Sequence, residues 1–150
     1  MIKKILITGI SGSGGSYLAE HILNKKGKFN IYGILRNKKK LSSYNLKNLK
    51  KNPRVKFSFI GLSNLAQLKK YLKKIKPDII YHLASNADVL SSFSKPYQIT
   101  KNNILITLNL LEAFRLAKIN CRLVLCSTSE VYGNVEKKFQ PITEKNKIDP

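Results

Sequence analysis

The residues with the clearest chemical meaning form a glycine-rich segment that directly follows an apolar run near the N-terminus. Gly9, Gly12 and Gly15 stand at intervals of three residues and lead into a predicted helix. In that place the first glycine allows a tight turn, the second lets the backbone approach a pyrophosphate, and the third lets the helix pack closely on the strand. The helix N-terminus adds N–H groups and a positive dipole. The pattern predicts a dinucleotide-binding loop with contacts from Gly9, Ser11, Gly12, Ser13, Gly14 and Gly15.

A cation stands where a carboxylate would select NAD. An Asp or Glu at the end of the second strand accepts hydrogen bonds from the adenosine ribose. Here Arg36 and then Asn37 follow the apolar run Gly33–Leu35, so a 2′-phosphate would meet a guanidinium group. We expect Arg36 and Asn37 to bind the adenosine end of the cofactor and to favour NADP over NAD. Lys38–Lys40, by contrast, are expected to belong to a solvated, lysine-rich surface.

Short apolar runs alternate with helical patterns along the whole chain. The predicted helices are Ser16–Lys26, the stretch from Leu65 to Ile75 before Pro77, and Tyr97–Ala117, whereas Lys38–Asn52 fits a helix or a loop. The predicted strands are Lys4–Thr8, Ile31–Leu35, Val55–Ile60, Asp78–Leu83 and Arg122–Cys126.

This alternation predicts one α/β domain over residues 1–150, with a Rossmann-like, doubly wound parallel sheet and helices on both faces. After the fifth strand the chain runs through a polar segment, Asn134–Pro150, without another helix pattern. One face of the sheet edge would then lack a cover. We therefore expect the domain to be truncated at its C-terminus, with the substrate-binding part absent.

The composition narrows the function classes. The 150 residues include 43% hydrophobic residues, and 28 basic against eight acidic side chains give a net charge of +20. Because 24 of the 28 basic residues are Lys and only four are Arg, we expect no nucleic-acid partner and instead an attraction for small anions. No apolar stretch approaches the length of a membrane span, and no secretion signal precedes the first strand, so we expect a cytoplasmic protein without a membrane partner.

Two cysteines and two histidines offer little for metal or redox chemistry. Cys121 and Cys126 are five residues apart, and at that spacing on a strand they would face opposite sides of the sheet. We expect two buried, reduced thiols and no metal site. His82 lies within an apolar strand, where a structural role is the stronger interpretation.

Four segments together resemble the extended short-chain dehydrogenase/reductase family, whose glycine pattern is TGxxGxxG. They are Thr8–Gly15, Lys76–Ser85, Asn103 with Thr107–Ala113, and Cys126–Gly133. Within that family, Gly15–Glu20, Gly33–Arg36 and Thr128–Glu130 are most similar to GDP-mannose 4,6-dehydratases. The chain departs from them at Ser13-Gly14, where a Gln-Asp pair is usual, and at Gly61-Leu62, where an Asp is missing.

The resemblance implies a nucleotide-sugar substrate, GDP-mannose in the first place, and a homo-oligomer in the full-length form. It also adds Leu62, Leu83, Ala84 and Ser85 to the expected cofactor contacts. At the carboxyl end of the fifth strand, Thr128 and Glu130 are expected to alternate onto one side as catalytic residues. The Thr128 hydroxyl would bond the sugar oxygen oxidised at C4, and the Glu130 carboxylate would move the C5 proton as water leaves C6.

The family's hydride chemistry uses a Tyr-x-x-x-Lys pair that follows the fifth strand. The one match here, Tyr97 and Lys101, precedes that strand, and we interpret it as coincidental. The 150-residue chain by itself is therefore expected to be inactive.

Three other functions stay open at this point. Two are enzymes of the same family, a UDP-glucuronate decarboxylase and a 4-keto-sugar epimerase or reductase. The third is a non-catalytic NADP-binding module.

Overall fold

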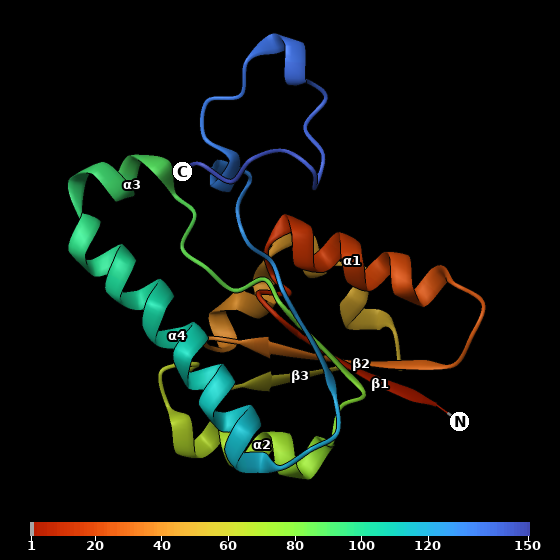
Figure 1. The fold of residues 1–150 in the computed structure, drawn as a ribbon. Coiled ribbons are helices and arrows are strands. Elements are labelled where there is room, and N and C mark those ends of the chain that lie inside the picture. The colour runs from red at the N-terminus through yellow and green to blue at the C-terminus, as the bar shows by residue number, and fades with distance from the viewer. Residues whose placement is uncertain (1) are drawn as a thin grey trace.

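The computed structural model describes residues 2–150, and within them a parallel sheet of five strands forms the centre of the fold (Figure 1). The strand order is β3-β2-β1-β4-β5, so the chain winds outward from β1 in one direction and then, from β4, in the other. All five predicted strands are confirmed, with ends that differ by one or two residues. They are β1 (Lys3–Thr8), β2 (Phe29–Leu35), β3 (Val55–Phe59), β4 (Ile79–His82) and β5 (Arg122–Leu125).

Four α-helices connect these strands in the described part of the chain. They are α1 (Ser13–Asn24), α2 (Leu65–Ile75), α3 (Val89–Ser94) and α4 (Pro96–Ala117). Helix α1 begins three residues earlier than predicted, because Gly12 is its N-cap and the remaining glycines of the loop lie in its first turn. Helix α3 was not predicted, although Asp88 caps it by accepting a hydrogen bond from the Ser91 N–H.

The segment that fits a helix or a loop consists of short 3₁₀ turns. They are η1 (Lys38–Ser42), η2 (Tyr44–Leu46) and η3 (Leu49–Lys51). Leu46 and Leu49 are buried, so these turns help to cover the sheet. Two further 3₁₀ turns, η4 (Ser129–Tyr132) and η5 (Lys137–Phe139), follow β5.

Two apolar layers lie on opposite faces of the sheet. Ile5 and Ile7 of β1 pack with α1 and with the turns η2 and η3, whereas Leu6, between them, packs with α2 and α4. This alternation is the period-two pattern of a strand that is buried on both faces. The doubly wound fold with helices on both faces is thereby confirmed, and Figure 1 shows α1 on one side of the sheet with α2 and α4 on the other.

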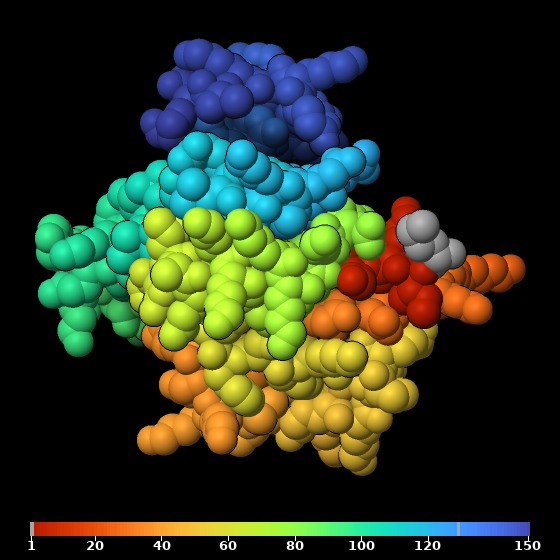
Figure 2. Space-filling view, turned by 90° about the horizontal axis from the view of Figure 1, so that it is seen from below, coloured from red at the N-terminus to blue at the C-terminus, as the bar shows by residue number. Residues whose placement is uncertain are grey.

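The edge strand β5 is less buried than its neighbours. Val124 and Leu125 are exposed, and the chain beyond Gly133 forms a lobe that projects from the α/β body in both views (Figures 1 and 2). The two cysteines are free; Cys121 is half-buried and Cys126 is exposed. The expectation of two buried thiols is wrong for Cys126, because β5 ends at Leu125. Burial raises the pKa of the Cys121 thiol to about 11.

None of the helices in residues 2–150 combines the length and apolarity needed to cross a bilayer.

Candidate cofactor site

A cavity of about 500 Å³ opens beside the glycine-rich loop, where the strand order reverses between β1 and β4. Ligands bind at such a switch point in open α/β sheets, outside the carboxyl ends of the strands. The predicted cofactor residues that line it are Gly9, Ser11, Gly12, Arg36, Leu62, Leu83, Ala84 and Ser85. The sequence therefore predicted cavity residues at the ends of β1, β2, β3 and β4.

The glycine-rich loop owes its shape to two positions that exclude a side chain. Gly9 has φ +74°, and a Cβ there would lie 2.7 Å from the Leu83 carbonyl carbon. At Gly15 a Cβ would collide with the Gly9 carbonyl oxygen. Both glycines lie directly against neighbouring backbone, so we interpret them as required for the fold of the loop.

Gly12 differs from these two glycines because it lines the cavity. Its φ of −78° is open to any residue, and a Cβ would stand 3.3 Å from the Gly9 oxygen, a close contact that a small shift relieves. Gly12 makes no side-chain cap for α1, and the helix begins beside the cavity. A side chain at this position would therefore occupy cofactor space more than it would disturb the fold.

Ser13, Gly14 and Gly15 lie in the first turn of α1, outside the residues that line the cavity. Gly15 is buried, and Ser13 accepts a hydrogen bond on its carbonyl from the Ser16 hydroxyl. The predicted contacts of these residues with a dinucleotide stay predictions.

Arg36 and Lys40 both line the cavity at the end of β2. The 3₁₀ turn η1 returns Lys40 to the cavity, and Asn37 caps this turn by accepting the Lys40 N–H at 3.3 Å. Asn37 itself lies outside the lining. Lys38–Lys40 are all exposed, as expected for a solvated surface, and Lys40 in addition lines the cavity.

Two side-chain hydrogen bonds tie this segment to the glycine-rich loop. The Ser43 hydroxyl and the Asn45 amide both donate to the Ser11 carbonyl, at 3.3 and 3.1 Å. The segment that carries Lys40 is thereby held beside the loop. No pattern in the sequence predicted these hydrogen bonds, since they join residues more than 30 positions apart.

Helix α4 and the end of β3 supply lining residues that sequence reasoning missed. Asn109 of α4 donates to the Leu62 carbonyl at 3.1 Å and so fixes the loop after β3. Residues next to Leu62 follow the same strand end and could have been found by the rule that selected Leu62. The missed lining residues are Ile34, Lys40, Ile60, Gly61, Ser63, Asn86, Asn102 and Ile106.

Thr128 and Glu130 do not alternate along a strand. β5 ends at Leu125, Thr128 caps the 3₁₀ turn η4, and its hydroxyl oxygen accepts the Glu130 N–H at 3.3 Å. The expected placement on one side of an extended strand is therefore wrong. Both residues are exposed and lie outside the residues that line the cavity.

Tyr97 and Lys101 lie on α4, one helical turn apart. The Lys101 ammonium stands over the Tyr97 ring, 5.5 Å from its centroid, and the Tyr97 side chain is 70% exposed. Neither residue belongs to the cavity lining, which agrees with the interpretation of this pair as coincidental.

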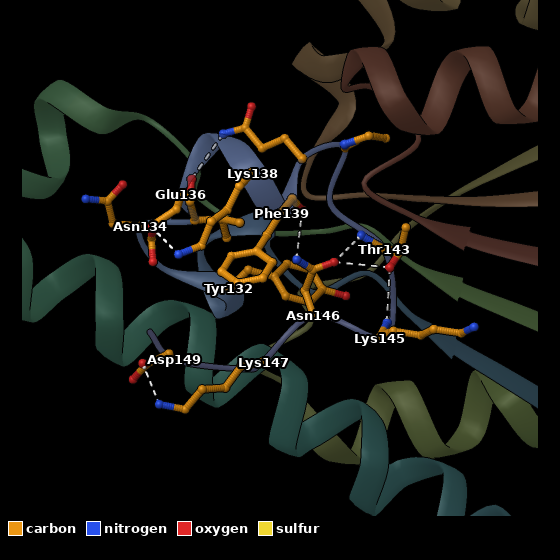
Figure 3. A pocket seen from close by; sticks show the side chains of 13 residues that line it. Tyr132, Asn134, Glu136, Lys138, Phe139, Thr143, Lys145, Asn146, Lys147 and Asp149 are labelled. Atoms are coloured by element: carbon orange, nitrogen blue, oxygen red, sulfur yellow. Dashed lines mark hydrogen bonds and ion pairs between the residues drawn. The ribbon is translucent and has the colours of Figure 1, made fainter.

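A second, larger cavity of about 800 Å³ lies wholly within residues 132–149 (Figure 3). The ion pairs Lys138–Glu136 and Lys147–Asp149, at 2.9 and 2.8 Å, are formed by residues that line it. One segment of chain forms this cavity, and the glycine-rich loop contributes nothing to its lining. The smaller cavity, beside the glycine-rich loop, is therefore the stronger candidate for a ligand-binding site. In residues 2–150 no cluster of His, Cys, Asp or Glu could hold a metal ion.

Comparisons with known proteins agree with this geometry. A family model described as GDP-mannose 4,6 dehydratase matches residues 6–150. The chain is 35% identical over 150 residues to a GDP-mannose 4,6-dehydratase of Vibrio cholerae, and 32% identical over 140 residues to one of Homo sapiens. These matches cover 95% and 88% of the chain, but only 40% and 37% of the relatives' own length.

Solved structures show the same architecture. A UDP-Glc/GlcNAc 4-epimerase from Campylobacter jejuni superposes with a TM-score of 0.81 at 26% identity, covering 99% of this chain and 43% of the other. A dTDP-glucose 4,6-dehydratase from Bacillus anthracis, solved in complex with NAD, gives 0.78 at 25% identity, covering 99% and 44%. With a family model that matches nearly its entire length and a dinucleotide-type cavity at the switch point of its sheet, the chain belongs to the GDP-mannose 4,6-dehydratase family.

Proposed function

We propose that this chain is the cofactor-binding portion of an NADP-dependent nucleotide-sugar 4,6-dehydratase that acts on GDP-mannose. The observation that carries the proposal is the cavity in which the glycine-rich loop and two cations, Arg36 and Lys40, meet. The substrate follows from the family and from the names of the relatives. The chain spans about 40% of the relatives' length, so the activity on a sugar is proposed for the whole protein.

The residues present fit a dinucleotide in size and chemistry. About 500 Å³ lies within the range of small-molecule and cofactor sites, which combine apolar walls with a few polar groups. Leu62 and Leu83 supply apolar surface, and Gly12 leaves room at the helix N-terminus, where phosphates bind well.

Arg36 and Lys40 favour a cofactor with an extra phosphate. Among the residues that line the cavity there is no Asp or Glu that would repel a 2′-phosphate or bond the ribose hydroxyls in its place. A guanidinium group offers a planar pair of donors to phosphate oxygens, and Lys40 adds a second positive charge. NADP is therefore the proposed cofactor, in preference to NAD.

The cavity residues Gly12 and Arg36 would hold the cofactor, whose nicotinamide would supply a hydride acceptor for C4 of the sugar and a hydride donor for C6. The Thr128 hydroxyl, whose oxygen accepts the Glu130 N–H, keeps its own proton to donate to the C4 oxygen of the sugar. Once C4 is a ketone, the neighbouring C5–H is acidic. Glu130 takes that proton from C5 and gives it to the C6 oxygen as the C5–C6 double bond forms and the C6–O bond breaks, so the C6 hydroxyl leaves as water.

Oxidation at C4 also needs a base for the proton of the sugar hydroxyl. Tyr97 is not placed for this, because it lies outside the cavity lining with Lys101 over its ring. We expect the 150-residue chain to bind cofactor weakly and to turn over no sugar. Loss of a positioned general base costs about 10² to 10⁴ in rate.

The test compares NADPH and NADH on Arg36→Ala by calorimetric titration. A charge-assisted hydrogen bond contributes about 1.5–3 kcal/mol, so the substitution should weaken NADPH about tenfold or more and leave NADH nearly unchanged. Lys39→Ala is the matched control, because Lys39 lies next to Lys40 but outside the cavity lining. This variant should bind both cofactors as the wild type does. Equal affinity of the wild type for NADH and NADPH would refute the NADP assignment.

A further inference from the structure

A buried histidine links three elements that meet behind the cofactor cavity. His82, at the end of β4, is 5% exposed. Its Nδ1 lies 2.7 Å from the Thr8 hydroxyl of β1, and its Nε2 lies 3.2 Å from the Thr107 hydroxyl of α4. Thr8 is fully buried. Both ring nitrogens therefore have hydroxyl partners.

The partners of Thr107 and Thr8 determine which group donates and which accepts in each hydrogen bond of this network. The Thr107 hydroxyl donates to the Asn103 carbonyl at 2.9 Å, so toward His82 it acts as acceptor and Nε2 carries the proton. In the neutral imidazole Nδ1 is then an acceptor, and the Thr8 hydroxyl donates its hydrogen bond to it. The Thr8 oxygen in turn accepts the Ala84 N–H at 3.2 Å.

The hydrogen-bond network ends at Ala84, a residue that lines the cavity. Ala84 belongs to the segment Leu83–Asn86, whose four residues all line it. At its other end Asn103 accepts the Asn86 N–H at 2.8 Å and donates to the Asn86 carbonyl at 3.0 Å. The segment is thus held at Ala84 and at Asn86, and Asn103 takes part in both sets of bonds.

The same segment also supports the glycine-rich loop. Gly9 lies so close to the Leu83 and Ala84 backbone that a Cβ there would be 2.7–2.8 Å from it. A shift of Leu83–Asn86 therefore changes two walls of the cavity together.

We propose that His82, as the neutral tautomer with its proton on Nε2, is a positioning residue that holds Leu83–Asn86 in the conformation that binds the dinucleotide. This inference rests on the proposed function, because it assumes that the cavity is the dinucleotide site. Burial lowers the pKa of His82, which agrees with a neutral ring at neutral pH.

The tautomer can be observed directly in the 150-residue chain. Proton–nitrogen correlation spectra of the ¹⁵N-labelled imidazoles at pH 7 should show His82 with Nε2 protonated and Nδ1 bare. His21, the other histidine of the chain, is on the exposed side of α1 and serves as the internal comparison. A proton on Nδ1, or a doubly protonated ring, would overturn the proposal whatever the cofactor does.

The positioning role is tested by NADPH affinity at a temperature where all variants are folded. Thr8→Val keeps the side-chain size but removes the donor to His82 and the acceptor for Ala84, and should weaken NADPH about fivefold or more, the effect of losing about one hydrogen bond. Thr8→Ser should restore most of the affinity. Thr107→Val removes the hydrogen bond between His82 and α4, and it replaces Thr8→Val in this test if Thr8→Val does not fold. Thr100→Val, on an exposed part of the same helix, is the control and should match the wild type.

Two outcomes separate the claims. If the wild type binds NADPH and Thr8→Val and Thr107→Val lower the melting temperature without changing the affinity, His82 only stabilises the core and the positioning role is wrong. If the wild type binds neither NADPH nor NADH, the proposed function fails and the positioning role with it.

Discussion

At the scale of single residues, the three glycines of the loop divide into two kinds. Gly9 and Gly15 have no room for a Cβ against neighbouring backbone, so a substitution there would disturb the fold. Gly12 has an ordinary backbone conformation and faces the cavity. The identical spacing of the three residues in the sequence does not reveal this difference.

Gly12 is for that reason the position at which binding and folding can be separated. Gly12→Val should place its side chain where pyrophosphate oxygens approach and reduce cofactor affinity by several kcal/mol, about the value of several hydrogen bonds. Gly12→Ala should show an intermediate loss, because its methyl group is smaller. Calorimetric titration gives the affinities and thermal unfolding checks the fold. Wild-type affinity in Gly12→Val would show that the cofactor lies elsewhere.

Residue types alone predicted one cation of the cavity and missed the other. Arg36 directly follows a strand, and a strand end is visible in the sequence as the end of an apolar run. Lys40 reaches the cavity only because η1 turns the chain back after Asn37. For Thr128 and Glu130 the sequence supported an extended strand, and the 3₁₀ turn η4 replaced it.

At the scale of elements, local capping decides where helices begin. The Asn64 side chain accepts the Gln67 N–H at 3.0 Å at the start of α2 and satisfies one of the N–H groups that the first turn leaves without a partner. The helix then buries Leu68 and Leu72 against the sheet. The cap and the apolar stripe act together to place α2 directly after the cavity loop.

Asn64→Ala should lower the free energy of unfolding by about 1 kcal/mol, the usual cost of losing an N-cap. In a domain of this size that corresponds to a fall in melting temperature of roughly 2–4 °C. Gln67→Ala is the matched control, because the cap uses only the backbone N–H of this residue and its side chain is exposed. Equal stability of Asn64→Ala and the wild type in thermal and denaturant unfolding would contradict the capping role.

The strands were predictable because β1, β2 and β4 are apolar on both faces and are flanked by polar turns. The long helices were predictable from apolar residues at spacings of three and four, as in α2. Helix α3 is only six residues long and has no buried residue, so it left no periodic signal. The turns η1 to η3 place single leucines in the core, a pattern that neither helical nor strand period describes.

At the scale of the whole molecule, two cavities compete for a ligand. One joins residues from across the sheet at its switch point, and the other belongs to the projecting segment after β5. The larger volume of the second does not decide between them, because only the first combines a helix N-terminus, cations and apolar walls contributed by several elements. The net charge of +20 attracts anionic ligands to either.

The most direct test of this account is an NMR titration of the ¹⁵N-labelled 150-residue chain with NADPH, followed amide by amide. We predict that the largest shifts fall on Gly9, Ser11, Gly12 and the segment Leu83–Asn86, and that the amides of residues 132–149 move little. Shifts confined to residues 132–149, or no shifts at millimolar NADPH, would contradict the claim that the glycine-rich loop and its cavity form the dinucleotide site.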